Sequence, residues 1–208
     1  MSSKSCITIG RQFGSGGREI GKLLAEKLNF PFYDRALISL AAKESGMDPE
    51  LFAEVDETAA NSLLYSLSMG LYSFGNGFSA MGDLPVNDRL YLLQHKIIKK
   101  IADEGPCVIV GRCGDYILRE KPELISVFIH ANINFRTQRA IEIHNIDKAR
   151  AEQIVTKTDK RRANYYSFYS GQRWGLAEQY DLCIDSSKLT IPQAVDVIYE
   201  YVNIRNKK

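Results

Sequence analysis

A glycine-rich loop between a strand and a helix is the feature that most limits how this chain can fold. Residues 10–21 read GRQFGSGGREIG, with five glycines in twelve positions. The loop follows a short β-branched run at 5–10 and leads into a helical pattern at 17–28. Backbone N–H groups in such a loop converge on an anion, and the positive end of the helix dipole adds to their field. The segment predicts a phosphate-binding turn, with a glycine-rich turn without ligand and a dinucleotide-binding fold as alternatives.

Short apolar runs alternate with longer helical patterns along most of the chain. The further strand candidates are 30–33, 107–110, 125–129 and 182–184, and the main helical patterns are 87–103, 135–144, 147–166 and 191–202. This alternation is typical of parallel strands joined by crossover helices. A chain of 208 residues suits one hydrophobic core, and no repeat or linker divides it. We therefore expect an α/β fold with four or five strands and a single domain, 1–208.

Composition excludes several other classes of protein. The net charge is only +2, from 27 Lys+Arg against 25 Asp+Glu, so the cationic excess typical of proteins that bind nucleic acid or anionic membranes is missing. The four cysteines form no C-x-x-C pair, which argues against a zinc site and a disulfide framework. Cys6, Cys107 and Cys183 lie in apolar runs, and we expect all three to be buried. The N-terminus shows no signal-peptide pattern, which favours the cytoplasm.

One long segment contains no charged residue. It covers residues 59–82, about the length of a membrane span, but it holds five serines and four glycines. That polarity argues against insertion into a membrane. We expect a flap or a contact surface instead, with an ordinary helix and loop as the alternative.

Four motifs, the first of them part of the glycine loop, follow the first strand in a distinctive order. The sequence reads GSGGREIG at 14–21, FPFYDR at 30–35, VIVGRCGDYIL at 108–118 and YDLCID at 180–185. Together with the first strand they resemble the cytidylate kinase-like family of P-loop proteins over nearly the whole chain. The resemblance implies a three-layer P-loop NTPase fold with a parallel sheet. It also implies a small acceptor-binding insertion at about 35–86 and a helical lid at about 147–175.

The same resemblance implies an activity. A protein of this family would be expected to move the γ-phosphoryl group of ATP, with Mg²⁺, onto a nucleoside monophosphate, most simply CMP or dCMP. The alternative is a nucleotide-binding module without kinase activity. Neither nucleic acid nor a membrane is expected as a partner, and the oligomeric state is left open.

The glycine loop departs from the usual P-loop, and this departure motivates the alternative of a nucleotide-binding module without kinase activity. In G-x-x-x-x-G-K-[ST] a lysine binds phosphate and a hydroxyl residue ligates Mg²⁺, whereas here Gly17 and then Arg18 and Glu19 stand at those positions. Arg18 is expected to supply the cation, because a guanidinium binds phosphate oxygens in a bidentate way. Glu19 either contacts Mg²⁺, directly or through water, or faces solvent. The residues expected to bind ATP are Gly14, Ser15, Gly16, Gly17, Arg18 and Glu19.

Other candidates follow from the sheet edge and from the resemblance. Arg112 and Asp115 follow a buried strand and would contact the acceptor, although Asp115 also suits a helix cap. Asp34 and Arg35 end another strand and are assigned to the same pocket, with a surface ion pair as the alternative.

A basic cluster in the long polar helix completes the predicted site. Arg161 and Arg162 are expected to act with Arg18 in catalysis, by closing over the transferred phosphoryl group. A solvated helix face is the main alternative, and the aromatic residues that follow at 165–169 leave stacking on single-stranded nucleic acid as a minor one. Trp174 is expected in the core, with a part in closing the lid, beside Arg173, as the alternative. No metal ligand is assigned.

Overall fold

The computed structural model describes residues 5–34 and 86–207. The predicted insertion at about 35–86, the uncharged segment 59–82 and Arg35 therefore lie almost wholly outside the described residues, and the predictions for them stay predictions.

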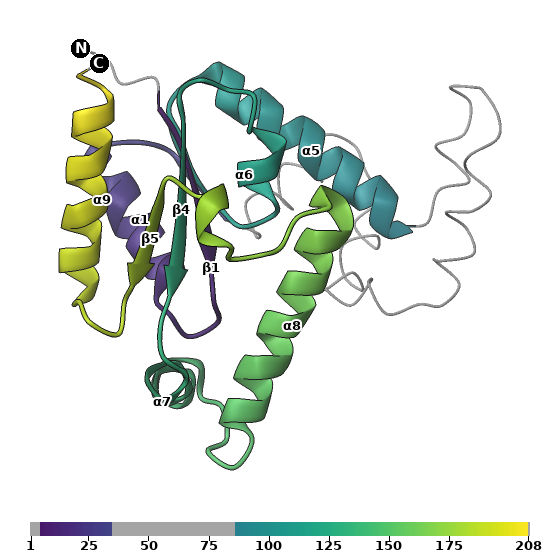
Figure 1. The fold of residues 1–208 in the computed structure, drawn as a ribbon, viewed down its shortest axis with the longest axis vertical. Coiled ribbons are helices and arrows are strands. Elements are labelled where there is room, and N and C mark those ends of the chain that lie inside the picture. Colours follow the sequence, from purple (N-terminus) through teal and green to yellow (C-terminus); the bar gives the residue numbers. More distant parts are fainter. Residues whose placement is uncertain (1–4, 35–85, 208) are drawn as a thin grey trace.

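Parallel strands form the centre of the molecule (Figure 1). The strands are β1 (Cys6–Arg11), β2 (Phe32–Tyr33), β3 (Cys107–Val110), β4 (Leu124–His130) and β5 (Leu182–Asp185). They pair in the order β2-β3-β1-β4-β5, and every pair is parallel. The middle strands are apolar on both faces, as a sheet covered by helices on both sides requires. The predicted parallel α/β sheet is confirmed.

Helices connect the strands and cover them. They are α1 (Gly17–Leu28), α5 (Val86–Glu104), α6 (Gly114–Ile117), α7 (Ile133–His144), α8 (Ala151–Ser170) and α9 (Ile191–Arg205), with a 3-10 helix, η3, at Ala177–Gln179. The prediction for α8 was four residues early at its start. Asp147 forms a turn instead, because its side chain accepts a hydrogen bond from the N–H of Ala149 and its carbonyl accepts one from Arg150.

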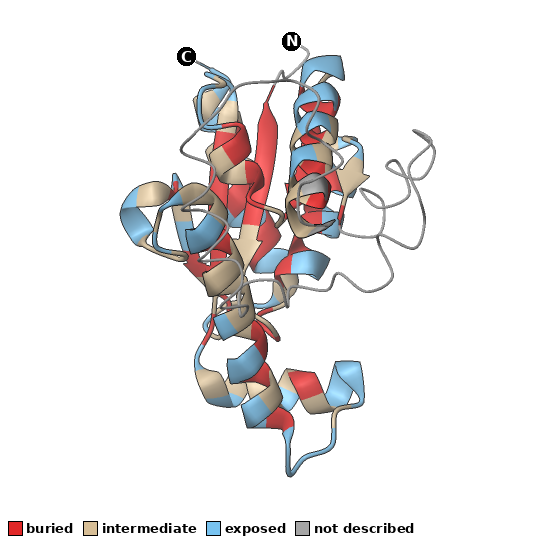
Figure 2. Cartoon of the chain, turned by 90° about the vertical axis from the view of Figure 1, so that its right-hand side faces the viewer, coloured by how far each residue is buried: buried red, intermediate tan, exposed pale blue. Residues whose placement is uncertain are grey.

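Two hydrophobic clusters give the fold its three layers. On one face of the sheet, Ile20 and Leu24 of α1 pack beside Ile198 and Val202 of α9. On the other face, α5 and α6 pack against the sheet through Ile98, Ile101 and Ile117. Figure 2 shows the buried residues concentrated on the sheet and on the inward sides of these helices. The three-layer P-loop arrangement predicted from the resemblance is confirmed, and α7 and α8 extend beyond the carboxyl ends of the strands (Figure 1).

The cysteines divide differently from the prediction. Cys6 and Cys107 are buried, but Cys183 is exposed, so its predicted burial was wrong. Leu182 and Ile184 of β5 face the core, and Cys183 between them points to the opposite side at the edge of the described sheet.

Within the described residues, no helix is both long and apolar enough to cross a membrane.

Candidate functional site

A cleft lies where the connections that follow β1 and β3 run to opposite faces of the sheet. The two strands are neighbours, yet α1 after β1 packs on one face of the sheet and α6 after β3 packs on the other. Ligands of open α/β sheets bind at such a point, outside the carboxyl ends of the strands. The glycine loop and the segment that begins at Gly111 line this cleft.

Contacts from three directions hold the glycine loop. Gly14 has a φ of 77°, and a Cβ atom there would lie 2.4 Å from the carbonyl oxygen of Arg136, so only glycine fits. The Ser15 hydroxyl donates to the carbonyl of Gln12 at 2.8 Å. The carbonyl of Ser15 accepts a hydrogen bond from Ser186 at 2.7 Å. The loop is therefore fixed in shape before any ligand binds.

The first turn of α1 has no side-chain cap. Gly16 is the N-cap residue, with a φ of 78°, and no side-chain hydrogen bond satisfies the N–H groups of the turn. Gly17 is buried at the start of the helix. Uncapped N–H groups at a helix N-terminus, together with the helix dipole, favour an anion. Gly14 to Gly17 thus have the geometry expected of a phosphate cradle.

Arg18 and Asp34, which were predicted for different substrates, contact each other. Both Nε and Nη2 of Arg18 lie 2.7 Å from Oδ2 of Asp34. The Asp34 carboxylate is buried, whereas the Arg18 side chain is 69% exposed. Asp34 is therefore not part of a mere surface ion pair, and the Arg18 guanidinium is directed onto a carboxylate.

Glu19 also has a partner, which the sequence analysis missed. Nη2 of Arg139, on α7, donates to Oε2 of Glu19 at 2.8 Å. The Arg139 side chain is only 20% exposed. The Glu19 side chain is 52% exposed, so it is accessible to solvent but also paired with Arg139. The only sequence signal for Arg139 was the pair of arginines in FRTQR of α7. Their spacing did not indicate which residues they contact.

The larger of two cavities in the cleft lies over the glycine loop. Its volume is about 450 Å³, within the usual range for small-molecule sites. Five cationic side chains and one carboxylate, Glu19, line it. The cationic residues are Arg11, Arg18, Lys22, Arg139 and Arg162. Such an excess of positive charge suits a polyphosphate.

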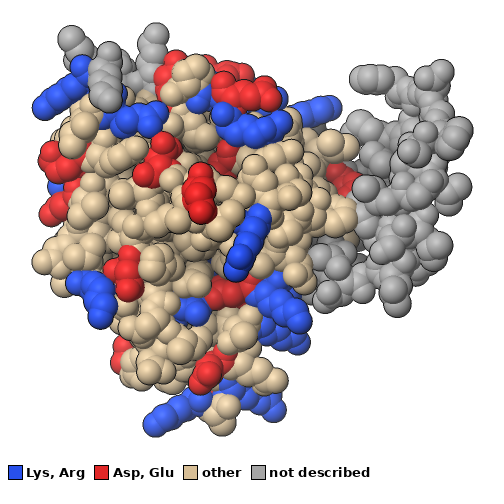
Figure 3. Space-filling view, in the orientation of Figure 1, with Lys and Arg blue, Asp and Glu red and all other residues tan. Residues whose placement is uncertain are grey.

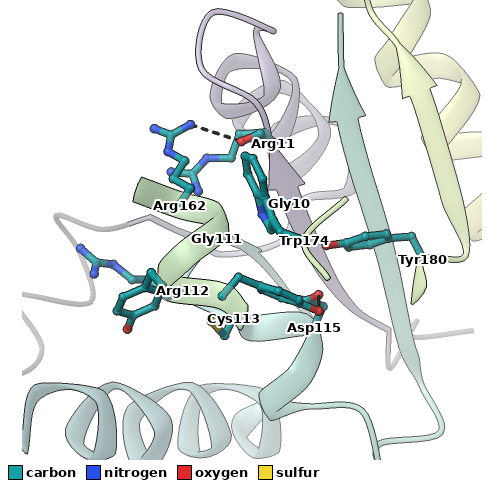
Figure 4. A pocket seen from close by; sticks show the side chains of 11 residues that line it. Gly10, Arg11, Gly111, Arg112, Cys113, Asp115, Arg162, Trp174 and Tyr180 are labelled. Carbon is teal, nitrogen blue, oxygen red and sulfur yellow. Dashed lines mark hydrogen bonds between the residues drawn. The ribbon is translucent and has the colours of Figure 1, made fainter. Parts of the chain in front are cut away.

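A smaller cavity, of about 40 Å³, lies between the ends of β1 and β3 (Figure 4). Three consecutive residues in its wall have positive φ angles: Gly111 at 77°, Arg112 at 59° and Cys113 at 54°. Positive φ values are uncommon outside glycine, so this turn is held by its surroundings. The Arg112 side chain extends to the side opposite Asp115 and Tyr180 (Figure 4).

Asp115 lines the smaller cavity and accepts a hydrogen bond from a side chain of α8. The Tyr166 hydroxyl donates to Oδ2 of Asp115 at 2.8 Å and lies 3.1 Å from Gln172 Oε1. Burial raises the pKa of the Asp115 carboxyl, and the hydrogen bond from Tyr166 opposes that rise. Burial, followed by the charge of Asp115, raises the pKa of Tyr166. The N-cap of α6 is Cys113 rather than Asp115.

The two predicted lid arginines differ in position. Arg162 lines both cavities, and its Nη1 donates to the carbonyl of Arg11 at 3.2 Å (Figure 4). Its guanidinium carbon lies 5.6 Å from the centre of the Phe13 ring. Arg161 lines neither cavity. The structure thus brings only Arg162 to the glycine loop.

Three tyrosines near the end of α8, Tyr165, Tyr166 and Tyr169, contact other parts of the protein, whereas Phe168 is exposed. Tyr169 stacks on Tyr91 of α5 with ring centres 3.9 Å apart. The Tyr165 hydroxyl lies 3.3 Å from Gln94. Trp174 is half-buried rather than a core residue, because it lines the smaller cavity and meets the Phe128 ring edge-on at 5.2 Å.

An ion pair that the sequence analysis also missed connects α8 with α7 and with the glycine loop. Asp159 forms an ion pair with Arg136 of α7 and accepts a hydrogen bond from the N–H of Phe13 at 2.7 Å. Both charged side chains are buried, at 14% and 9% exposure. Burial raises the pKa of Asp159, although the N–H of Phe13 and Arg136 act in the opposite direction.

Metal binding has one candidate among the residues described. They contain no group of three or more His, Cys, Asp or Glu side chains able to hold an ion. Mg²⁺ needs no such group when it arrives with a nucleotide, since phosphates, waters and one or two carboxylates bind it. The Glu19 carboxylate, on the wall of the larger cavity, fits that part.

The surface in view does not form one basic patch. Figure 3 shows Lys and Arg side chains interspersed with Asp and Glu side chains on this face.

Comparisons with known proteins agree with this geometry. A cytidylate kinase from Methanocaldococcus jannaschii is 26% identical over 205 residues, which cover 92% of this chain and 94% of the relative. A crystal structure of an uncharacterized protein from Eubacterium ventriosum has a TM-score of 0.72 at 29% identity, with 96% and 99% of the two chains covered. Shikimate kinase from Bacteroides thetaiotaomicron has a TM-score of 0.55 at 15% identity, with 96% and 98% covered, a likeness of fold. The model of the cytidylate kinase-like family matches residues 6–188, and the chain therefore belongs to that family.

Proposed function

We propose that the protein is a nucleoside monophosphate kinase, which moves the γ-phosphoryl group of ATP onto CMP or dCMP in the presence of Mg²⁺. One observation carries the proposal: a cationic cavity over a phosphate loop meets a second cavity, and Arg11 and Arg162 line both. Two adjoining sites are what transfer between two bound nucleotides requires. The similarity to a cytidylate kinase from Methanocaldococcus jannaschii supports cytosine as the base of the acceptor.

In this proposal the larger cavity receives the triphosphate. The N–H groups of the glycine loop bind the phosphates, and the surrounding guanidinium groups offset their charge. The Glu19 carboxylate would help to hold Mg²⁺ that arrives with ATP, and the ion would offset negative charge on the phosphates. Arg162 lies over the loop, where negative charge is redistributed during transfer.

The acceptor would enter from the β3 side. Arg112 and Asp115 offer a cation and an acceptor of hydrogen bonds there, as the resemblance implies. An acceptor phosphate oxygen attacks the γ-phosphorus, the bond to the β–γ bridging oxygen breaks, and the products are ADP and a nucleoside diphosphate. The attacking oxygen is already anionic, so positioning and charge neutralisation suffice without a general base. A cavity of about 40 Å³ admits only part of a nucleotide, so we expect its walls to move when the acceptor binds.

An assay of ADP release tests this function. ATP and Mg²⁺ would be combined with CMP, dCMP, UMP, AMP and GMP in turn, with reactions lacking acceptor or containing EDTA as controls. We expect turnover that depends on the acceptor and is highest with CMP or dCMP.

The rival function, a nucleotide-binding module, gives a different result. It would raise the melting temperature with ATP and show no turnover with any acceptor. Turnover without any acceptor would indicate an ATPase and contradict the proposal.

A further inference from the structure

The lysine that a P-loop normally supplies has no obvious substitute among the cations nearest the first turn of α1. Arg18 directs two nitrogens onto Asp34, and Arg139 donates to Glu19. Lys22 lies one turn further along α1, and its side chain is 61% exposed. The side chain that fills the place of the lysine is therefore the better guide to the charge beside the transferred group.

The position of the missing lysine is closed. A Cβ atom on Gly17 would lie 2.5 Å from Cβ and 3.0 Å from Cγ of Arg11, and 3.3 Å from Cβ of Ile129. Carbon atoms that are not bonded do not approach to 2.5 Å, and the base of a side chain cannot swing away as its far end can. Glycine at position 17 and arginine at position 11 therefore form a matched pair, in which the Arg11 side chain occupies the space beside the helix start.

From this point the Arg11 side chain runs toward the acceptor side. Its Nη1 atom lies 2.1 Å from where a Cβ atom on Gly111 would be, so the guanidinium rests against that glycine at the end of β3. Arg11 lines the larger cavity with the glycine loop and the smaller cavity with Gly111, as Arg162 also does (Figure 4). The group thus extends from the phosphate loop to the turn expected to bind the acceptor.

We infer that Arg11, the last residue of β1, takes the place of the P-loop lysine and binds the phosphoryl group that passes between the two nucleotides. This inference rests on the proposed phosphoryl transfer and assigns a catalytic residue to it. A planar guanidinium has five N–H donors, so it contacts oxygens of the donor and the acceptor phosphates together. A lysine at position 17 would offer a single ammonium centre from the donor side.

Replacing Arg11 with methionine tests the inference, because methionine keeps much of the apolar stem and removes the charge. We expect kcat to fall about 100-fold or more, as when a preorganised charge at a phosphoryl group is lost. Arg11→Lys should retain part of the lost activity. Arg119→Met is the matched control, since Arg119 is exposed, lies outside the lid region and lines neither cavity, and its kcat should equal that of the wild type. An Arg11→Met variant with a wild-type melting temperature and a kcat within twofold of the wild type overturns the inference.

A binding experiment separates this inference from the proposed function. If the wild type turns over no acceptor, the proposed function fails, and calorimetry with ATP and with inorganic tripolyphosphate then tests Arg11 alone. We expect both ligands to bind at least tenfold more weakly to Arg11→Met than to the wild type. Equal affinities for the two proteins would remove Arg11 from the phosphate site, whatever the wild-type activity.

An exchange of the two side chains gives a second test. Gly17→Lys alone should lower the melting temperature, because its Cβ meets Arg11. The double variant Arg11→Gly with Gly17→Lys opens that space and restores the usual P-loop lysine, so its kcat should exceed that of Arg11→Gly at least tenfold. A Gly17→Lys single variant as stable and as active as the wild type would show that the two side chains do not share one space.

Discussion

Arg161 and Arg162 are adjacent in sequence, yet only Arg162 reaches the cavities. Arg162→Ala is expected to lower kcat about 100-fold while changing the KM for the acceptor little, because the guanidinium acts most where charge is redistributed in the transition state. Arg161→Ala is the matched control, with kcat close to the wild type. Steady-state kinetics with CMP and ATP measure both. Equal losses in the two variants would contradict a separate role for Arg162 in catalysis.

Asp115 gives a pH-dependent prediction at the same scale. Burial raises its pKa in the folded protein, so the folded state holds the proton more tightly than the unfolded chain, and stability falls as pH rises above the ordinary value of 3.8. Asp115→Asn removes this titration and keeps an acceptor for the Tyr166 hydroxyl. The melting temperature of Asp115→Asn minus that of the wild type should therefore become more positive as pH rises from about 3.5 to 8. Thermal melts over this range measure it, and a difference that shrinks with rising pH contradicts the raised pKa.

At the scale of secondary-structure elements, α8 is attached to its neighbours at its middle and near its C-terminal end. Asp159 ties it to Arg136 of α7 and to the N–H of Phe13, while Tyr169 stacks on Tyr91 of α5. These contacts already hold α8 over the glycine loop. Any movement of a lid therefore has to begin in segments next to Asp159 and Tyr169.

Breaking the Asp159 anchor should be costly. Asp159→Ala is expected to lower the free energy of unfolding by about 3 kcal/mol, because it leaves the Arg136 guanidinium buried without its carboxylate. The double variant Arg136→Met with Asp159→Leu should lose less, since it buries no lone charge. Urea denaturation measures both, and a loss below about 1 kcal/mol for Asp159→Ala would show that the pair is exposed to water in solution.

For the whole molecule, the two cavities share walls, and so the two substrates should affect each other. We expect CMP and a nonhydrolysable ATP analogue together to protect residues 147–174 from hydrogen exchange more than either ligand alone, because closure needs contacts to both. The core strand β4, which lines neither cavity, serves as an internal control and should not change. Exchange in 147–174 that is the same with one ligand and with two would contradict a lid in this region.

The sequence by itself determined the sheet, its longer helices and the place of the glycine loop. Apolar runs such as 107–110, and the spacing of Ile20, Leu24 and Leu28, are local patterns, and each local pattern has few compatible structures. The glycines of the loop were informative for the same reason, because the backbone at Gly14 tolerates no side chain.

The tertiary structure alone decided which charged groups meet. Arg18 reaches Asp34 sixteen positions away, and Arg139 reaches Glu19 across 120 positions. Arg11 was not a candidate from the sequence at all, because nothing in its neighbours along the chain shows that its side chain fills the space beside Gly17. A long arginine side chain takes its direction from the carboxylates, carbonyls and empty space around it, and folding brings these together from distant parts of the chain.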